Sequence, residues 1–351
     1  MADGVFELDQ AARRRALLPA LVDLTEHHRA RCEGYGRILA AIGHGPDRRY
    51  AEVPDLPWLP TRLFKHHALH SVEPAAVYRV LTSSGTTGTA SRIHVDRAAA
   101  AAQQRALAAT LRTVIGSARL PMLVVDSGTL LRDRTAMSAR AAGVLGMMTF
   151  GRDHVFALDE RETIDRGAVE SFLRAHGGAP FLIFGFTFMV WLHLYALVRD
   201  RPLDLSNGIL IHSGGWKKLA DRAVDNHEFR RGLAAACGLV RVHNFYGMVE
   251  QLGTIHLEGP SGGSLYCPDF ADVIVRDPVT WRPAPIGRPG VVEVVTTCAG
   301  AHPGHVLLTE DLGVVQGVDD GDWPGTRFAI LGRLPAAEVR GCADAYPDEA
   351  P

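Results

Sequence analysis

The sequence Thr82-Ser83-Ser84-Gly85-Thr86-Thr87-Gly88-Thr89 gathers hydroxyl side chains and glycines between two apolar segments, 77–81 and 92–96, that are predicted to be strands. Gly85 and Gly88 allow the backbone to turn its N–H groups toward an anion, and the hydroxyls add donors with little bulk. Neither a Walker A motif nor a G-x-G-x-x-G dinucleotide motif is present in this loop. The pattern therefore indicates either a phosphate-binding loop or a simple Ser/Thr/Gly hairpin.

Helices and strands are expected to alternate after this loop. Strands are predicted at 122–126, 181–186 and 208–215, and helices at 97–115, 137–145, 164–176, from 187 to 198, and 219–236. This alternation predicts an α/β fold with a mainly parallel sheet. Past Arg241, β-rich segments separated by Gly/Pro turns predict a small β-subdomain, with strands at 240–247, 271–277, 290–297, 305–317 and 327–333.

The sequence before the loop divides into a helical part and an extended part. Apolar residues recur at helical spacing over 8–42, which predicts one long helix or two with a break near Gly34. Pro54, Pro57 and Pro60 predict an extended segment that crosses the surface and delivers Lys65 to its place of action.

The apolar run 181–198 approaches the length of a membrane span. Gly185, Thr187 and His193 interrupt it, so a buried strand followed by a buried helix is the favoured interpretation. The aromatic part of this run, 184–191, could line a fatty-acyl tunnel or a compact aromatic pocket, or could belong to the core.

The composition indicates which binding partners and which cellular compartment to expect. The 351 residues have a formal net charge of −2 and a pI near 6.8, so the chain has no basic field for nucleic acid. Five widely spaced cysteines without zinc spacing indicate a reducing compartment, and the N-terminus has no apolar signal core. We therefore expect a cytoplasmic protein without a membrane span; its oligomeric state is open.

The loop sequence SSGTTG resembles the phosphate-binding loop of the adenylate-forming superfamily of acyl-CoA synthetases, luciferases and adenylation domains. The segment 243–251, HNFYGMVEQ, resembles that superfamily's Tyr-Gly-x-x-Glu motif, which implies that Tyr246 packs on adenine and Glu250 helps to hold Mg²⁺. The segments 309–313 and 331–333 resemble its ribose-binding and hinge motifs, with Asp311 and Arg333 at the matching positions.

More narrowly, the chain is similar to the acyl-protein synthetase family typified by LuxE, which activates fatty acids in bacterial bioluminescence. The similar stretches run in order from about residue 54 to residue 342: LPTRLFK, SSGTTGTASRIHVD, ILIHSGGWKKL, NFYGMVEQLGTIHLE, PGHVLLTEDLGVV and FAILGRLPAAEVRGC. The resemblance implies an ATP-dependent ligase that forms an acyl-AMP and pyrophosphate and then transfers the acyl group to a thiol or an amine.

The resemblance also implies a domain plan. The adenylate-forming large domain, with stacked mainly parallel sheets, helices and a small β-subdomain, should occupy 1–333. Its N-terminal helices should lie in 1–50 and its β-rich subdomain in 240–333, followed by a tail at 334–351. The usual C-terminal lid domain and its catalytic lysine are expected to be absent, because only 18 residues, none of them lysine, follow Arg333.

The ATP site follows from these segments. Asp311 can accept hydrogen bonds from both ribose hydroxyls, and Gly214 and Gly215 leave room for a flat adenine, although a helix-entry turn would also use them. Glu250 is the candidate ligand of Mg²⁺, with a surface glutamate as the alternative. The candidate ATP-binding residues are Ser83, Ser84, Gly85, Thr86, Thr87, Gly88, Arg92, Gly214, Gly215, Tyr246, Gly247, Met248, Asp311 and Arg333.

The catalytic candidates are Lys65, Lys217, Glu250 and Cys342. The chain has three lysines, Lys65, Lys217 and Lys218, and one of them could replace the lid-domain lysine. Cys342 matches the cysteine that carries the acyl group in the LuxE-type family, and Arg340 beside it would favour the thiolate; an unremarkable tail cysteine is the alternative.

Further cysteines and histidines are expected to be structural. Cys237 and Cys267 should lie in the core, and His302 and His305 should be loop residues near a substrate entrance. The expected partners are a carboxylic acid and a carrier protein or acyl reductase. The second hypothesis is a catalytically degenerate accessory subunit of a reductase that binds a nucleotide or an acyl-adenylate without turnover.

Overall fold

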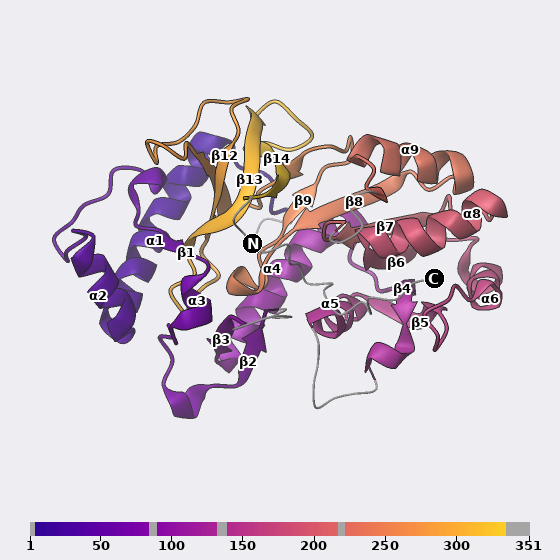
Figure 1. Ribbon diagram of the computed structural model, residues 1–351, viewed down its shortest axis with the longest axis horizontal. Helices are drawn as coiled ribbons and strands as arrows, with labels where there is room; N and C mark the ends of the chain where they lie inside the picture. The colour runs from indigo at the N-terminus through magenta and orange to yellow at the C-terminus, as the bar shows by residue number, and fades with distance from the viewer. Residues whose placement is uncertain (1–3, 84–89, 132–138, 217–221, 335–351) are drawn as a thin grey trace. The chain divides into compact units, whose positions relative to one another are not determined.

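The computed structural model describes residues 4–83, 90–131, 139–216 and 222–334 (Figure 1). They form two compact units. The β-rich unit comprises the described residues of 1–113, 247–259 and 264–338. The parallel-sheet unit comprises those of 114–246 and 260–263.

A five-stranded, all-parallel sheet is the centre of the parallel-sheet unit. Its strand order is β8-β7-β6-β4-β5. All residues of β6 and β7 are buried, as expected for apolar strands covered on both faces. The strands are β4 (Leu120–Ser127), β5 (Gly151–Leu158), β6 (Phe181–Phe186), β7 (Gly208–Ser213) and β8 (Arg241–Tyr246).

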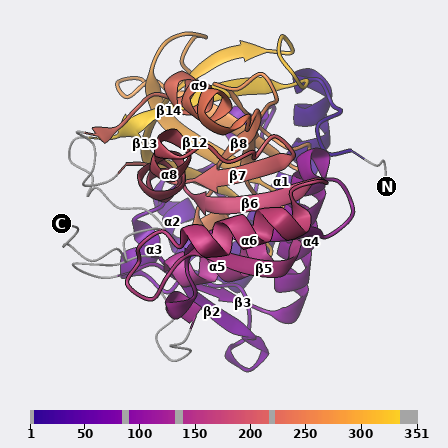
Figure 2. The same cartoon turned by 90° about the vertical axis from the view of Figure 1, so that its right-hand side faces the viewer.

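Helices connect these strands, and Figure 2 shows α6 and α8 alongside the sheet. The side chains of Asp165 and Asp225 cap α6 and α9 by accepting from the backbone N–H groups of Ala168 and Glu228. The elements are η3 (Gly128–Leu131), α5 (Ala139–Met148), α6 (Arg166–His176), α7 (Thr187–Met189), the π-helix η4 (Val190–Tyr195), α8 (Ala196–Asp200) and α9 (Asn226–Cys237).

The β-rich unit is built on an antiparallel sheet of order β11-β12-β13-β14-β10-β9, with β1 added in parallel to β13. A separate hairpin pairs β2 with β3. The strands are β1 (Leu59–Pro60), β2 (Arg79–Thr82), β3 (Arg92–Val95), β9 (His256–Glu258), β10 (Leu265–Tyr266), β11 (Ala271–Arg276), β12 (Gly290–Thr296), β13 (Val306–Val318) and β14 (Thr326–Arg333).

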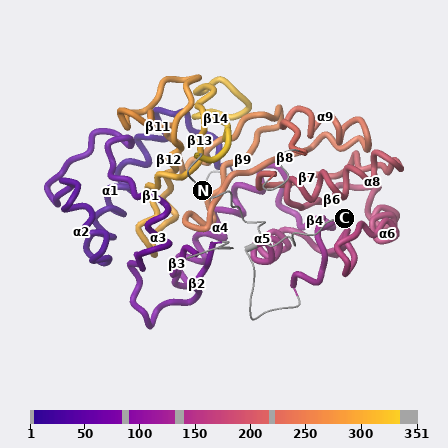
Figure 3. The backbone as a smooth tube through the Cα atoms, in the orientation of Figure 1, coloured from indigo at the N-terminus to yellow at the C-terminus, as the bar shows by residue number. Residues whose placement is uncertain are grey.

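The longest helix of this unit, α1, lies beside strands that are far away in the sequence (Figure 3). Leu17 and Leu21 pack with Ile274 and Val295 in one buried cluster. The helical elements are α1 (Gln10–Arg31), α2 (Glu33–Ala41), η1 (Val53–Asp55), α3 (Leu63–His66), η2 (Pro74–Ala76), α4 (Arg97–Ile115) and η6 (Val249–Gln251).

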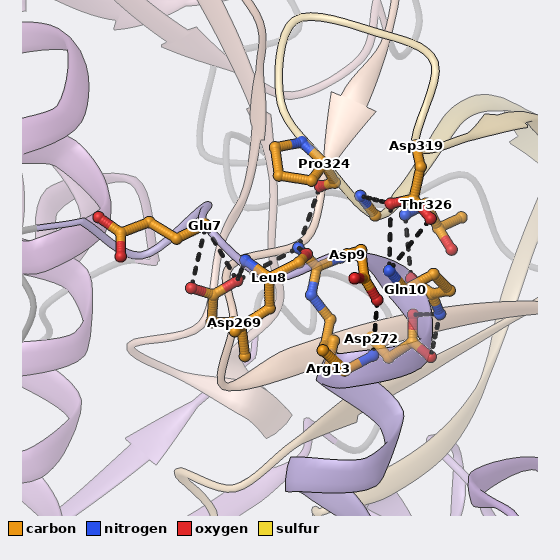
Figure 4. A network of polar contacts seen from close by, with 12 residues as sticks. Glu7, Leu8, Asp9, Gln10, Arg13, Asp269, Asp272, Asp319, Pro324 and Thr326 are labelled. Carbon is orange, nitrogen blue, oxygen red and sulfur yellow. Dashed lines mark hydrogen bonds and ion pairs between the residues drawn. The ribbon is translucent and has the colours of Figure 1, made fainter.

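A polar network fixes the first turn of α1 to these strands (Figure 4). The Gln10 amide nitrogen Nε2 donates to both carboxylate oxygens of Asp272 at 3.0 Å, and Gln10 Oε1 accepts from the backbone N–H of Thr326 at 3.1 Å. Arg13 is fully buried, and its Nη2 donates to the Pro324 carbonyl at 3.1 Å. These bonds set the position of α1 because a buried polar group strongly favours the arrangement that satisfies it.

Most predicted elements are confirmed. The helix at 97–115 has the predicted bounds, 181–198 is a buried strand followed by helix, and 8–42 forms two helices separated at Cys32. In the described part of the chain, no helix is both long and apolar enough to cross a membrane. α9 begins at Asn226, later than the predicted 219.

One prediction was wrong, and four short or partly polar strands were missed. The proline-rich segment is not simply extended over the surface, because Val53–Asp55 forms a 3-10 turn, Val53, Leu56 and Leu59 are buried, and β1 pairs with β13, although Asp55 is exposed. The missed strands are β1, β5, β9 and β10. β1 and β10 have two residues each and β9 has three, too few to show a period, and β5 begins with exposed polar residues.

Candidate active site

Glu250 lies on the short 3-10 turn η6 of the β-rich unit, and its side chain is buried, with 7% exposed. Burial raises the pKa of this carboxyl group, whereas the hydroxyl of Ser91 and the positive charges of Lys65 and Arg333 oppose the rise. A buried carboxylate with a raised pKa gains stability from a nearby cation, because a positive charge favours its ionised form.

Ser91 closes the base of the predicted phosphate-binding loop. Its backbone N–H donates to Ser83 Oγ at 2.9 Å, and its carbonyl accepts from the Ser83 N–H at 3.2 Å. The Ser91 hydroxyl is fully buried and makes no hydrogen bond of standard geometry with the described residues, but it is close enough to Glu250 to favour the charged carboxylate. The described base of the loop, Ser83 and Ser91, is therefore closed near Glu250.

The residue after Ser91 has a different environment. Arg92 is exposed in β3, where it pairs with Thr82, and its charge acts on His94. The positive charges that lower the pKa of Glu250 include those of Lys65 and Arg333.

The position of Lys65 is set by pairing of the preceding segment with β13. Leu59 and Pro60 pair with Leu307 and Leu308, and the Thr61 N–H continues this pairing by donating to the Leu308 carbonyl at 3.0 Å. The chain then turns into α3, which carries Lys65. Lys65 is the one lysine among the described residues.

An ion pair next to Lys65 holds the same segment. Arg62 pairs with Glu310 of β13, with Nη2 and Nε at 2.7 and 2.9 Å from Oε1. This pair fixes the start of α3 against β13 at the strand position directly before Asp311.

Asp311 and Arg333 are opposite each other in the β13–β14 pairing. Arg333 Nε is 3.3 Å from Asp311 Oδ1, and the side chains are 35% and 13% exposed respectively. The Asp311 carboxylate is thus held by a cation and remains open to solvent on part of its surface, as a ribose acceptor needs to be.

In the parallel-sheet unit, the candidate adenine-binding residues follow two adjacent strands. Ser213 at the end of β7 pairs with Phe245 of β8, so Gly214 and Tyr246, the next residues, are neighbours at the carboxyl edge of this sheet. Gly214 has φ +85°, a conformation that favours glycine, and a Cβ on Gly215 would meet no atom within 4 Å. Ligands of parallel sheets commonly bind at this edge.

Gly247 and Met248 lead into the Glu250 turn. A Cβ on Gly247 would lie 3.1 Å from Ile255 Cγ2, so this position is crowded. The Met248 carbonyl accepts from the Gln251 N–H at 3.1 Å and closes the turn.

The carboxylate of Glu250 and the nearby hydroxyl of Ser91 suit Mg²⁺ as oxygen donors. Among the described residues, no group of three or more His, Cys, Asp or Glu could hold a metal ion. One buried carboxylate and one buried hydroxyl are hard oxygen donors, and Mg²⁺ typically takes only one or two protein carboxylates because phosphate and water fill its other positions.

Several candidates lie outside the described residues: Ser84, Gly85, Thr86, Thr87, Gly88, Lys217, Lys218 and Cys342. Cys237 and Cys267 are buried as predicted, and burial raises the pKa of both thiols, that of Cys237 to about 11. They are core residues rather than nucleophiles.

The two histidines are loop residues as predicted, but both are buried instead of lying at an open entrance. His302 and His305 are 0% and 1% exposed, and burial lowers their pKa values to about 4 and about 3. His305 Nε2 lies 3.0 Å from Thr25 Oγ1 of α1, and His302 Nε2 lies 2.7 Å from the Glu250 carbonyl. Both rings are internal contacts and do not line a substrate entrance.

Two residues of the site, Ser91 and Gln251, were not singled out from the sequence, and His302 was expected only as a loop residue near a substrate entrance. Ser91 could have been suspected because it follows the loop at the start of the predicted strand. Gln251 and His302 carry no local signal, since their contacts are to backbone groups more than 40 residues away along the chain.

Nearly the whole chain is similar to one family of proteins. A family model described as acyl-protein synthetase, LuxE, matches residues 5–350. The long-chain-fatty-acid–luciferin-component ligase of Vibrio harveyi is 24% identical over 334 residues, which cover 91% of this chain and 84% of the relative. The ligase of the same name from Aliivibrio fischeri is 23% identical over 307 residues, covering 83% and 78%.

Among solved structures, 2-hydroxyisobutyryl-CoA ligase in the postadenylation state with 2-HIB-AMP is similar. The TM-score is 0.68 at 17% identity, and the match covers 93% of this chain and 69% of that chain. This likeness confirms the predicted fold class, the α/β large-domain fold of adenylate-forming ligases.

Proposed function

The chain belongs to the acyl-protein synthetase family typified by LuxE, and from this premise we propose that it uses ATP to activate a carboxylic acid as an acyl-AMP and then transfers the acyl group to a nucleophile. The observation that carries this proposal is the family match over 5–350 together with a buried Glu250 beside the anchored base of the SSGTTG loop.

The first half-reaction joins two anions. A carboxylate oxygen of the acid attacks the α-phosphorus of ATP, the bond from that phosphorus to the bridging oxygen breaks, and pyrophosphate leaves with the electron pair. Positive charge and fixed donors must therefore surround the phosphates. Lys65, which acts electrostatically on Glu250, is the described lysine that could supply this charge.

Glu250 would hold Mg²⁺ through its carboxylate, with the Ser91 hydroxyl as a second oxygen donor nearby. When bound, Mg²⁺ neutralises phosphate charge and helps pyrophosphate to leave. The loop 83–88 would donate N–H and hydroxyl hydrogen bonds to the phosphates. Asp311 would accept from the ribose hydroxyls, and Tyr246 with Gly214 and Gly215 would bind adenine.

We assign the remaining candidates more general roles. Gly247 and Met248 would shape the backbone beside the nucleotide, and Arg333 would orient Asp311 through their ion pair. Arg92 and Lys217 would contact a phosphate of ATP or the carboxylate of the acid.

In the second half-reaction, a thiolate sulfur attacks the acyl carbonyl, the C–O bond to AMP breaks, and AMP leaves with the electron pair. The acceptor would be Cys342 or a thiol on a carrier protein or reductase. The two ligases from Vibrio harveyi and Aliivibrio fischeri are named for long-chain fatty acids, so a long-chain fatty acid is the first substrate to test. A cytoplasmic location is consistent with this chemistry, because ATP is abundant there.

ATP–pyrophosphate exchange tests the first half-reaction. We expect exchange with at least one acid from a panel that includes long-chain fatty acids and small aromatic acids, and a loss of about 100-fold or more in Glu250→Ala, because the charge that holds Mg²⁺ is gone. Asp320→Ala, at an exposed carboxylate paired with Arg327, is the matched control. ATP binding without exchange for any acid would favour a degenerate accessory subunit.

Acyl labelling tests the second half-reaction. With a radiolabelled acid and ATP, we expect the protein to become covalently labelled, and Cys342→Ser to abolish the label while exchange persists. Cys298→Ser is the control, since burial raises the pKa of that thiol and disfavours its thiolate. A label that survives in Cys342→Ser would place the acyl group elsewhere.

A further inference from the structure

The His302 side chain contacts the two short elements that carry Glu250 and Lys65, η6 and α3. Its Nε2 lies 2.7 Å from the backbone carbonyl of Glu250, to which it donates. Its ring also meets the ring of Phe64 edge to face, with centroids 5.7 Å apart and an interplanar angle of 86°. Phe64 directly precedes Lys65 in α3. One buried imidazole therefore contacts both the backbone of Glu250 and the residue next to Lys65.

The surrounding loop holds this imidazole in place. A Cβ on Gly304 would lie 2.5 Å from His302 Nε2 and 2.7 Å from the Glu250 carbonyl, so only glycine allows their close approach. Gln251 adds a second connection, because its Nε2 donates to the Gly304 carbonyl at 2.8 Å and to the Val294 carbonyl at 3.1 Å. Hydrogen bonds at the adjacent residues Glu250 and Gln251 thus connect the turn η6 to the loop that contains His302 and Gly304.

Contacts of this kind are needed because Lys65 and Glu250 both lie on short helical elements. α3 has four residues and η6 has three. A helical segment this short does not hold its own geometry, since a single turn loses more conformational entropy than its few hydrogen bonds return. Tertiary contacts must therefore fix the separation between the Lys65 and Glu250 side chains, and His302 contacts both segments.

We propose that His302 is a positioning residue for acid activation: its Nε2–H group fixes the Glu250 turn, and its ring fixes α3 and therefore Lys65. This inference rests on the proposed function of Glu250 and Lys65. Groups that hold metal ligands in place commonly change metal affinity 10- to 100-fold when they are replaced, and small displacements of charged groups lower the rate of a positioned reaction.

Two variants separate the two contacts. His302→Phe keeps a ring against Phe64 and removes the donor, whereas His302→Gln keeps a donor of similar reach and removes the ring. His305→Phe is the matched control, because His305 is equally buried in the same loop but contacts Thr25 and His28 of α1. Each variant is measured by calorimetry for the Mg²⁺ dependence of ATP binding, by exchange kinetics, and by thermal unfolding.

For His302→Phe, we expect the Mg²⁺ concentration for half-maximal ATP binding to rise about tenfold. For His302→Gln, we expect this concentration to stay within about threefold of the wild-type value while kcat of exchange falls about tenfold. The KM for the acid should not change in either. His305→Phe should lower Tm and leave both the Mg²⁺ dependence and kcat unchanged.

Phe64→Leu provides a milder test, since it keeps apolar volume and removes the ring contact with His302. It should lower kcat without changing the Mg²⁺ dependence. The proposal is overturned if the His302 variants change only Tm, if His305→Phe shifts the Mg²⁺ dependence equally, or if Phe64→Leu keeps full kcat. If the proposed function is wrong, the wild-type protein shows no exchange, which differs from every outcome above. In that case the Mg²⁺ dependence of ATP binding still tests whether His302 acts as the donor to the Glu250 turn.

Discussion

At the scale of single residues, two carboxylates of the β-rich unit have environments suited to different tasks. Glu250 is buried, and burial raises its pKa, so a cation would stabilise its ionised form. Asp311 is partly exposed and paired with Arg333 at 3.3 Å, so part of its carboxylate stays open to solvent. The motif positions predicted two acids, and their different burial is consistent with the proposed roles of Glu250 as a metal ligand and Asp311 as a ribose acceptor.

Asp311→Ala tests the second of these tasks. Loss of an ionised acceptor that binds two hydroxyls removes about 2 kcal/mol of binding free energy, so we expect the Kd for ATP to rise about 30-fold. The KM for the acid should change much less. Calorimetric titration with ATP measures the effect, and Asp320→Ala serves as the control because its carboxylate is exposed and bound to Arg327. An unchanged ATP affinity in Asp311→Ala would refute the ribose role.

At the scale of elements, strand β13 arranges most of the site in its unit. Its residues Leu307 and Leu308 pair with β1 and thereby place α3, while Asp311, three positions later, faces Arg333 of β14. The strand was predicted at 305–317 from its apolar pattern, and β1 was not, because two residues show no periodicity. Pairing between segments about 250 residues apart therefore decides where Lys65 lies.

The docking of α1 depends on one glycine between β13 and β14. Gly325 has φ +92°, and a Cβ there would lie 1.8 Å from Arg13 Nη1. We expect Gly325→Ala to lower the free energy of unfolding by about 3 kcal/mol, because the backbone is strained and the buried guanidinium is displaced. Urea unfolding measures this change.

Gly43→Ala is the matched control for Gly325→Ala. Gly43 has φ +77° and open space around its missing Cβ, so only the backbone strain applies, and we expect a loss of about 1 kcal/mol. Equal losses in the two variants would show that the contact with Arg13 does not matter.

At the scale of the whole molecule, buried histidines make stability depend on pH. Burial lowers the pKa of His28 to about 2, of His212 and His305 to about 3, and of His256 and His302 to about 4. These values lie below the unfolded value of 6.5, so below pH 6.5 the unfolded chain binds protons that the folded chain does not. Their contribution is complete above pH 6.5 and is lost progressively as the pH falls from 6.5 through the folded values of about 4 to about 2. The raised pKa values of two carboxylates, Glu250 and Glu293, act in the opposite direction but are fewer.

We therefore expect the free energy of unfolding to fall by about 3 kcal/mol between pH 6.5 and 5.5, since each neutral histidine contributes up to about 1.4 kcal/mol per pH unit. Urea unfolding at pH 7.5, 6.5 and 5.5 measures the slope. His305→Gln keeps a donor toward Thr25 and should reduce the slope by one histidine, and exposed His66→Gln should not change it. Equal stability at pH 7.5 and 5.5 would contradict the prediction.

Sequence alone was enough for the fold class, the bounds of α4 and the order of the motifs, because these depend on local periodicity and on short contiguous patterns; it also proposed Glu250 and Asp311 as site residues. The burial of the proline-rich segment, the pairing of β1 with β13 and the contact of His302 with Glu250 came only from the tertiary structure. Each of these joins residues 50 or more positions apart. Such contacts form because folding buries distant apolar groups together and pairs distant polar groups by hydrogen bonds. A local sequence pattern does not indicate which distant group will be the partner.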